Sequence, residues 1–239
     1  MGDAVTPAER PAVDPARIAD RVAQVRERIM RLSPWPDRVT VVAVTKGFGI
    51  DAVRAAVAAG VADIGENYAQ ELVAKAADVA ATDLRTPVRW HYLGSIQRNK
   101  VGRLAPVVSC WQSLARVEEA TSIARYRPGA RVLVEVDVSD VAGRNGSRPD
   151  EVAGVVAGAA SAGLDVAGLM TVAPQGAVAA RGAFAAVADL ADRLGVPERS
   201  MGMSDDYEVA LELGSTMVRL GRVLFGDRPP RSGGPGATV

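Results

Sequence analysis

The stretch RVTVVAVT, residues 38–45, is rich in β-branched residues and is apolar on both faces of an extended chain. Such a run is typical of a strand in a parallel sheet, because helices cover both faces of that kind of sheet. RVLVEVDVS, residues 131–139, repeats the pattern and predicts a second buried strand. These two stretches therefore favour an α/β protein with a parallel sheet.

Strand and helix patterns alternate along the rest of the chain. Apolar residues at 18, 22, 25 and 29 recur at three- and four-residue steps, which predicts an opening helix before the first strand. The predicted strands cover residues 38–45, 62–66, 88–94, 106–113, 131–139, 164–172, 199–204 and 216–226. The predicted helices between them cover residues 53–58, 68–80, 99–105, 115–125, 149–162, 177–194 and 205–213.

This alternation implies parallel strands joined by right-handed crossovers. Eight such steps within about 190 residues favour a TIM (β/α)8 barrel over an open doubly wound sheet. Neither GxGxxG nor GxxxxGK[ST] follows the first strand, which argues against a dinucleotide-binding or P-loop fold. We expect one barrel domain over residues 15–226, with an extra N-terminal helix. Residues 1–14 and the Pro/Gly-rich residues 227–239 are expected to be tails.

The composition excludes several classes of function. Twenty-eight basic residues balance 28 acidic ones, which removes the main electrostatic argument for a nucleic-acid partner. A single cysteine, Cys110, and a single histidine, His91, exclude the usual zinc sites, and we expect no metal. No apolar run approaches the about 20 residues of a membrane span, and the acidic start is unlike a secretory signal. We therefore expect no membrane association and a cytoplasmic location.

Lysine is rare in this chain. Of the 28 cationic residues only Lys46, Lys75 and Lys100 are lysines, so arginine serves wherever a fixed charge suffices. Lys46 follows the first strand directly, and active sites of TIM barrels lie at the carboxyl ends of the strands. An amine buried there loses its proton more easily and becomes a nucleophile toward a carbonyl. Lys75 and Lys100 fall on predicted helices, where we expect solvated roles.

Small and hydroxyl-bearing residues gather around the last two strands. TIM barrels often bind phosphate there, through backbone N–H groups and short hydroxyls. The candidates are Ser200, Gly202, Ser204, Ser215, Thr216 and Gly221. An aldehyde-reactive lysine opposite a phosphate cradle suits pyridoxal 5′-phosphate (PLP). A lysine-dependent aldolase that acts on a sugar phosphate without PLP fits the same two features and stays open.

Six stretches of the chain closely resemble the pyridoxal phosphate homeostasis protein family. They are AVTKG (43–47), IGENYAQEL (64–72), WHYLGSIQRNK (90–100), GLMTVAP (168–174), SMGMSDDYEVAL (200–211) and GSTMVRLGRVLFG (214–226). The resemblance implies a single-domain TIM barrel similar to the N-terminal barrel of bacterial alanine racemase. It also implies that Lys46 carries PLP as a Schiff base.

The resemblance extends to further site residues. It places Asn67 near the cofactor ring and Arg219 against the pyridine nitrogen. It gives the phosphate to Ser200 and the backbone around Gly221, and with less support to Ser215 or Thr216, whose hydroxyls we count as candidates. One departure concerns residues 143–147, where this chain has Arg144 in a segment that often carries a lysine in the family.

Arg219 has a consequence for chemistry. Arginine donates hydrogen bonds and does not accept them, so the pyridine nitrogen stays unprotonated and the ring is a weak electron sink. Racemases of this fold obtain a second base from another domain, whereas this chain ends at residue 239. We therefore expect a PLP-binding protein for PLP homeostasis with little or no turnover. A true racemase, using Tyr68 or Tyr92 as second base, is the alternative.

The resemblance also bears on partners. It points to PLP-dependent apoenzymes as recipients of the cofactor. The sequence carries no local signature of an assembly, and we expect a monomer or a weak dimer.

Overall fold

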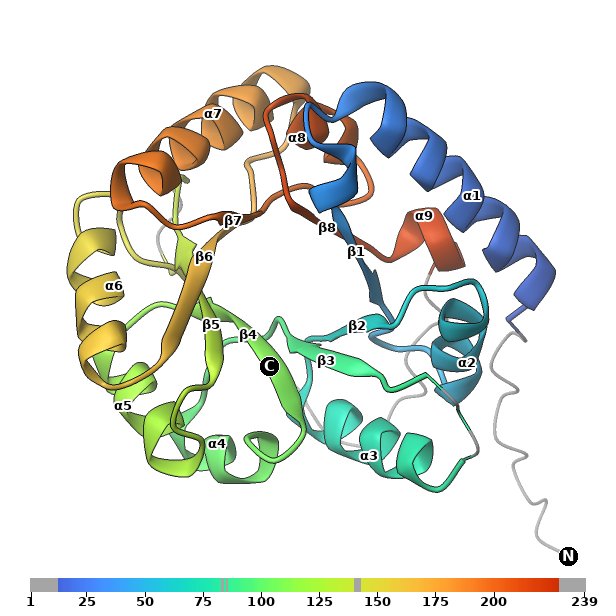
Figure 1. Cartoon of the computed structure of the whole chain (residues 1–239), viewed down its shortest axis with the longest axis horizontal. Coiled ribbons are helices and arrows are strands. Elements are labelled where there is room, and N and C mark those ends of the chain that lie inside the picture. Colours follow the sequence, from blue (N-terminus) through green and yellow to red (C-terminus); the bar gives the residue numbers. More distant parts are fainter. Residues whose placement is uncertain (1–12, 83, 85, 140–142, 228–239) are drawn as a thin grey trace, which may run out of the picture.

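The chain folds into a closed barrel of eight parallel strands, each bonded to its neighbours in sequence order (Figure 1). This computed structural model describes residues 13–82, 84, 86–139 and 143–227. The strands are β1 (Thr40–Val44), β2 (Asp63–Glu66), β3 (Arg89–Tyr92), β4 (Val108–Leu114), β5 (Arg131–Val136), β6 (Asp165–Thr171), β7 (Glu198–Ser200) and β8 (Met217–Leu220). The pairing of β1 with β8 closes the barrel, which confirms the predicted TIM barrel.

Helices form the outer ring. They are α1 (Pro15–Leu32), α2 (Ile50–Ala58), α3 (Ala69–Ala80), α4 (Arg98–Leu104), α5 (Val117–Tyr126), α6 (Val152–Ser161), α7 (Ala177–Leu194), α8 (Tyr207–Glu212) and α9 (Arg222–Phe225), with a 3-10 turn η1 at Pro36–Arg38. The extra helix α1 lies between α8 and α2 and outside the short α9 (Figure 1). Asp14, which the sequence assigned to a tail, accepts hydrogen bonds from the backbone N–H groups of Ala16 and Arg17 and caps α1. The other tail residues, apart from Val13 and Asp227, fall outside the described part of the chain.

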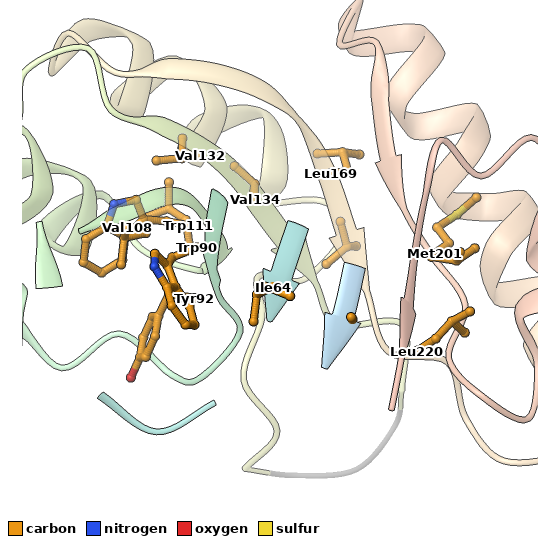
Figure 2. Packing of buried hydrophobic residues seen from close by; sticks show 14 of the residues in the cluster. Ile64, Trp90, Tyr92, Val108, Trp111, Val132, Val134, Leu169, Met201 and Leu220 are labelled. Carbon is orange, nitrogen blue, oxygen red and sulfur yellow. The ribbon is translucent and has the colours of Figure 1, made fainter. Parts of the chain in front are cut away.

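Apolar layers cover the barrel wall on both sides, one outside it and one inside it. The larger one lies between the strands and the helices, and Figure 2 shows Trp90, Tyr92 and Trp111 packed together in it from β3 and β4. The rings of Tyr92 and Trp111 meet edge to face, with centroids 5.6 Å apart. The smaller layer fills the barrel, from the side chains of Val42, Cys110, Leu133, Ala167, Met170 and Met217. Residues that alternate along each strand therefore serve two separate layers.

The last βα unit differs from the prediction of one long strand over residues 216–226. β8 ends at Leu220, and residues 222–225 form α9 instead. The strand stops because the backbone at Gly221, with a ψ of −73°, leaves the extended conformation and begins α9. A four-residue helix then buries Leu224 beneath α1.

Two other boundaries are also shorter than predicted. The strand expected over residues 199–204 ends at Ser200, because Gly202 has a φ of +93° that interrupts extended backbone. The helix expected from Pro149 begins at Val152, after a turn over residues 148–151.

Within the residues that the structure describes, no helix combines the length and hydropathy that a membrane crossing requires.

Candidate functional site

The carboxyl ends of the strands form one rim of the barrel, and four of the predicted site residues lie on it. Lys46 is two residues beyond the end of β1, and Asn67 directly follows β2. Ser200 is the last residue of β7, and Gly221 directly follows β8. The rim places these residues together because all eight strands run in the same direction.

The turn that carries Lys46 is held from both sides. Gly47 has a φ of +81°, which glycine adopts without strain, and its N–H donates to Glu71 Oε2 at 2.9 Å. On the other side, the N–H of Thr45 donates to the carbonyl of Gly65 at 3.0 Å. Lys46 itself is half-buried. The backbone on each side of this lysine is thus fixed by β2 and α3.

Lys75 contradicts the expectation of a solvated helix lysine. Its side chain is 7% exposed, and Nζ donates to Glu66 Oε1 at 2.5 Å and to the carbonyl of Thr45 at 2.8 Å. Glu71 Oε2, one turn earlier on α3, also lies 3.5 Å from the Lys75 Nζ. Burial raises the pKa of the Glu66 carboxyl, while the Lys75 ammonium and the Thr45 hydroxyl oppose that rise. α3 turns this lysine inward, so it supports the Lys46 turn from behind.

Asn67 carries an unsatisfied polar atom at the rim. Its side-chain Oδ1 is buried and has no hydrogen-bond partner within the described structure. Gly94 lies so close that an added Cβ would stand 2.0 Å from the Asn67 carbonyl oxygen. A glycine at position 94 is therefore needed for the backbone of Asn67 to sit where it does. A buried amide oxygen without a partner costs free energy unless something supplies a donor.

Arg219 lies inside the barrel and is fully buried. Its Nη1 donates to the carbonyl and the hydroxyl of Ser200, both at 2.7 Å, and its Nη2 donates to the carbonyl of Thr171 at 2.7 Å. Burial lowers the pKa of Arg219 to about 10, although the charges of Glu135 and Asp206 act in the opposite direction. The guanidinium therefore remains a cation at neutral pH, with N–H groups left over for a ligand.

Ser215 and Thr216 directly precede β8, at its amino end, and their hydroxyls already have partners in the protein. The Ser215 hydroxyl faces the carbonyl oxygens of Arg199, Met201 and Met217 at 2.8–3.2 Å. Thr216 Oγ1 accepts the N–H of Arg199 at 2.8 Å. Two to four residues separate them along the chain from Arg219 and Leu220, at the carboxyl end of β8. Their hydroxyls join β7 to β8.

Around Gly221 the rim has the small residues that were predicted. Gly221 lies against β1, since an added Cβ would stand 3.3 Å from the Val44 carbonyl oxygen, and it begins α9. Ser204 Oγ accepts the N–H of Val223 at 3.2 Å. A short helix after the eighth strand is a frequent phosphate position in TIM barrels.

Two interior residues were missed by the sequence analysis. Gln112, fully buried in β4, accepts the hydroxyl of Ser200 at 2.7 Å. Glu135, buried in β5, accepts a hydrogen bond from Asn145, and burial raises the pKa of its carboxyl. Each is the one residue of its strand with an amide or carboxyl side chain, and that was the available signal.

Comparison with known proteins shows which family the chain belongs to. The model for the alanine racemase N-terminal domain matches residues 13–229. A pyridoxal phosphate homeostasis protein of Pseudomonas aeruginosa is 36% identical over 220 residues, which cover 88% of this chain and 94% of that protein. One of the same name from Escherichia coli is 34% identical over 229 residues, covering 88% and 97%.

Solved structures agree with these matches. PipY of Synechococcus elongatus with PLP bound superposes with a TM-score of 0.76 at 29% identity, over 87% of this chain and all of that one. Alanine racemase of Corynebacterium glutamicum shares the fold, with a TM-score of 0.63 at 19% identity over 94% and 64% of the two chains. This chain belongs to the pyridoxal phosphate homeostasis proteins, within the family of the alanine racemase N-terminal domain.

Proposed function

We propose that this chain binds PLP through a Schiff base on Lys46 and serves in PLP homeostasis with little or no turnover. The single observation that carries the proposal is the rim. It carries Lys46 and the unpartnered Oδ1 of Asn67, and the buried donor Arg219 contacts Ser200 of the rim from inside the barrel. The relatives that carry the homeostasis name, and the PLP-bound PipY, support the same cofactor.

The residues present fit such a cofactor chemically. An amine on a fixed turn forms a Schiff base with an aldehyde, a guanidinium donates to a ring nitrogen, and Asn67 Oδ1 accepts from a ring hydroxyl. Gly221 leaves backbone N–H groups near the start of α9 open to a phosphate, with Ser200 near by. Ser215 and Thr216 are not included, because their hydroxyls bond the backbone at the amino end of the barrel.

When bound, PLP supplies an electrophilic carbon and an aromatic ring that withdraws electrons. Arg219 limits the second property. Its guanidinium is cationic at neutral pH and presents only donors, so a ring nitrogen facing it is not protonated. The chain's residues then hold the ring and its carbonyl carbon without making it a strong electron sink.

The two tyrosines considered as a second base offer little for turnover. Tyr92 is 3% exposed and its hydroxyl donates to the carbonyl of Ser95 at 3.3 Å. Burial also raises the pKa of Tyr92, which leaves less of the phenolate that would take up a proton. Tyr68 lies next to Asn67 and is 39% exposed. The proposal of weak turnover rests on these positions together with Arg219.

The test is the visible absorption spectrum of the purified protein, before and after borohydride, with the modified peptide located by mass. A yellow protein with the label on Lys46 supports the proposal, and Lys46→Ala is expected to be colourless. Lys100→Arg, on α4, is the matched control and keeps the colour. A wild-type protein that stays colourless after incubation with PLP overturns the proposal and favours an aldolase without PLP.

Turnover is measured separately. We expect no formation of D-alanine from L-alanine at ordinary enzyme rates by the yellow protein. Rapid racemisation that is lost in Lys46→Ala would replace the homeostasis role by that of a racemase.

The proposal includes transfer of PLP to PLP-dependent apoenzymes in the cytoplasm, by a monomer or weak dimer. Mixing the loaded protein with an apoenzyme and following recovery of that enzyme's activity tests the transfer. Recovery no faster than with free PLP argues against it.

A further inference from the structure

A chain of polar side chains crosses the interior of the barrel below Arg219. Ser200 Oγ donates to Gln112 Oε1 at 2.7 Å, and Gln112 Nε2 lies 2.7 Å from His91 Nδ1. His91 Nε2 lies 2.9 Å from Asp63 Oδ1. Each of these four side chains belongs to a residue that is less than 9% exposed. We call Arg219, Ser200, Gln112, His91 and Asp63 the interior chain.

A sulfur atom fixes the direction of the interior chain. Gln112 Nε2 lies 3.0 Å from Met217 Sδ, and a thioether only accepts hydrogen bonds. The amide nitrogen of Gln112 must therefore be the atom that faces both Met217 and His91. His91 Nδ1 then accepts, and the imidazole proton sits on Nε2, directed at Asp63.

The ends of the interior chain carry opposite charges. Burial alone would raise the pKa of Asp63, but hydrogen bonds from His91 and Arg89 outweigh it and lower that pKa. Asp63 is thus an acceptor only. At the other end Arg219 Nη1 donates to Ser200 Oγ, whose one proton goes to Gln112. Every donor in the interior chain consequently points from the Arg219 cation toward the Asp63 anion.

We propose that Gln112 and His91 are positioning residues for Arg219, an inference that rests on the proposed function of the rim. Because Gln112 Oε1 takes the Ser200 proton, the hydroxyl is held with a lone pair toward Arg219. Gln112 in turn is held in that orientation by His91 and Met217. Loss of the amide releases the Ser200 proton, and the guanidinium loses one of its three fixed acceptors.

The first test needs no cofactor. His91 is the chain's one histidine, so nitrogen-15 histidine labelling gives the NMR signal of a single imidazole. From the hydrogen bonds of the ring we expect a proton on Nε2 and an Nδ1 that only accepts. A ring protonated on Nδ1 overturns the direction of the interior chain.

Gln112→Glu tests the same link from the other side. A carboxylate cannot donate to Nδ1, so His91 must donate instead and the ring is expected to become doubly protonated. An unchanged imidazole signal in Gln112→Glu contradicts the contact.

The second test measures PLP binding. Gln112→Leu is expected to weaken PLP affinity about tenfold, as the loss of one supporting hydrogen bond allows, and to shift the absorbance maximum of the bound cofactor while the label stays on Lys46. Met170 also lies inside the barrel but is not part of the interior chain. Met170→Leu is therefore the matched control and is expected to keep the wild-type PLP affinity and absorbance maximum. If Gln112→Leu binds as tightly as wild type, the positioning role is overturned. If wild type binds no PLP, it is the proposed function that fails.

Discussion

The two ends of β8 lie only a few residues apart, yet the structure gives them different tasks. At the amino end the hydroxyls of Ser215 and Thr216 bond backbone groups of β7 and β8. At the carboxyl end Arg219 and Gly221 face the rim that also carries Lys46. The hydroxyls at the amino end thus have partners within the protein, whereas Arg219 and Gly221 at the carboxyl end belong to the PLP site that we propose. Strand direction, rather than residue type, separates the two groups.

The largest expected effect is a loss of stability at Lys75, a structural residue that lies at the carboxyl end of the barrel. Lys75 supports the carboxyl end, yet it is buried and paired with Glu66, so it belongs with the structural residues. Lys75→Met leaves the Glu66 carboxylate buried without its cation and is expected to lower the free energy of unfolding by about 3–5 kcal/mol. Urea denaturation of the variant and of Lys100→Met, a less buried lysine on α4, measures the difference.

The double variant Lys75→Met/Glu66→Leu sharpens the same point. Replacing a whole buried ion pair by apolar residues is often nearly neutral, so most of the lost stability is expected to return. A loss below about 1 kcal/mol in Lys75→Met alone would mean that the ion pair is not buried as described.

The next effect tests the amino end directly. Thr216→Val leaves the buried N–H of Arg199 without its acceptor and is expected to cost about 1–3 kcal/mol, and Ser215→Ala is expected to cost a similar amount. PLP affinity is expected to stay within about twofold of wild type, since neither hydroxyl belongs to the PLP site that we propose. Thr121→Val, at an exposed position on α5, is the control for the side-chain change.

The opposite result would restore these residues to the cofactor site. Loss of PLP binding with unchanged denaturation in either variant contradicts the placement of Ser215 and Thr216.

The same comparison explains how far the sequence could be interpreted. The alternation of apolar strands and helices predicts the barrel, and Lys46 stands out because a lone lysine follows a buried strand. The motifs shared with the family then predict Asn67, Ser200, Arg219 and Gly221 as cofactor-binding residues. The predicted strand over residues 216–226 already puts Ser215 and Thr216 at its start, but the sequence does not show that their hydroxyls bond the backbone of neighbouring residues.

Contacts across the barrel could not be predicted from the sequence, because the residues that form them are far apart along the chain. Gln112 meets Ser200 over a separation of 88 residues, and Lys75 meets Thr45 over 30. No local periodicity encodes such pairs, because they depend on how eight strands close on each other. A polar residue in an apolar strand signals that a partner exists, but not which residue it is.

A smaller, pH-dependent effect distinguishes two carboxylates at the amino end. The hydrogen bonds from His91 and Arg89 overcome the effect of burial and lower the pKa of Asp63 below its ordinary 3.8. A carboxyl whose pKa is lower in the folded state stabilises the fold above its unfolded pKa, and this contribution is lost as the pH falls through the folded pKa. Wild type is therefore expected to lose stability below about pH 4 more steeply than Asp63→Asn.

Thermal unfolding followed from pH 7 to pH 2 measures this slope. Asp165→Asn, which removes an exposed partner of Arg131 at the same end of the barrel, is expected to leave the slope nearly unchanged. Equal slopes for wild type and Asp63→Asn would show that the Asp63 carboxylate is not stabilised by hydrogen bonds from His91 and Arg89.

The smallest effect concerns an exposed cation beside the rim. Arg222 directly follows Gly221 and pairs with Asp205, but the two side chains are 56% and 78% exposed. Solvent screens such a pair, so Arg222→Ala is expected to change the free energy of unfolding by no more than about 0.5 kcal/mol. Since the backbone N–H groups at Gly221, and not this side chain, are assigned to the phosphate, PLP affinity is also expected to change by less than about twofold at physiological salt. A tenfold loss of PLP affinity in Arg222→Ala, with unchanged denaturation, would instead make the side chain part of the rim, because only a direct charge on the phosphate acts that strongly from so exposed a position.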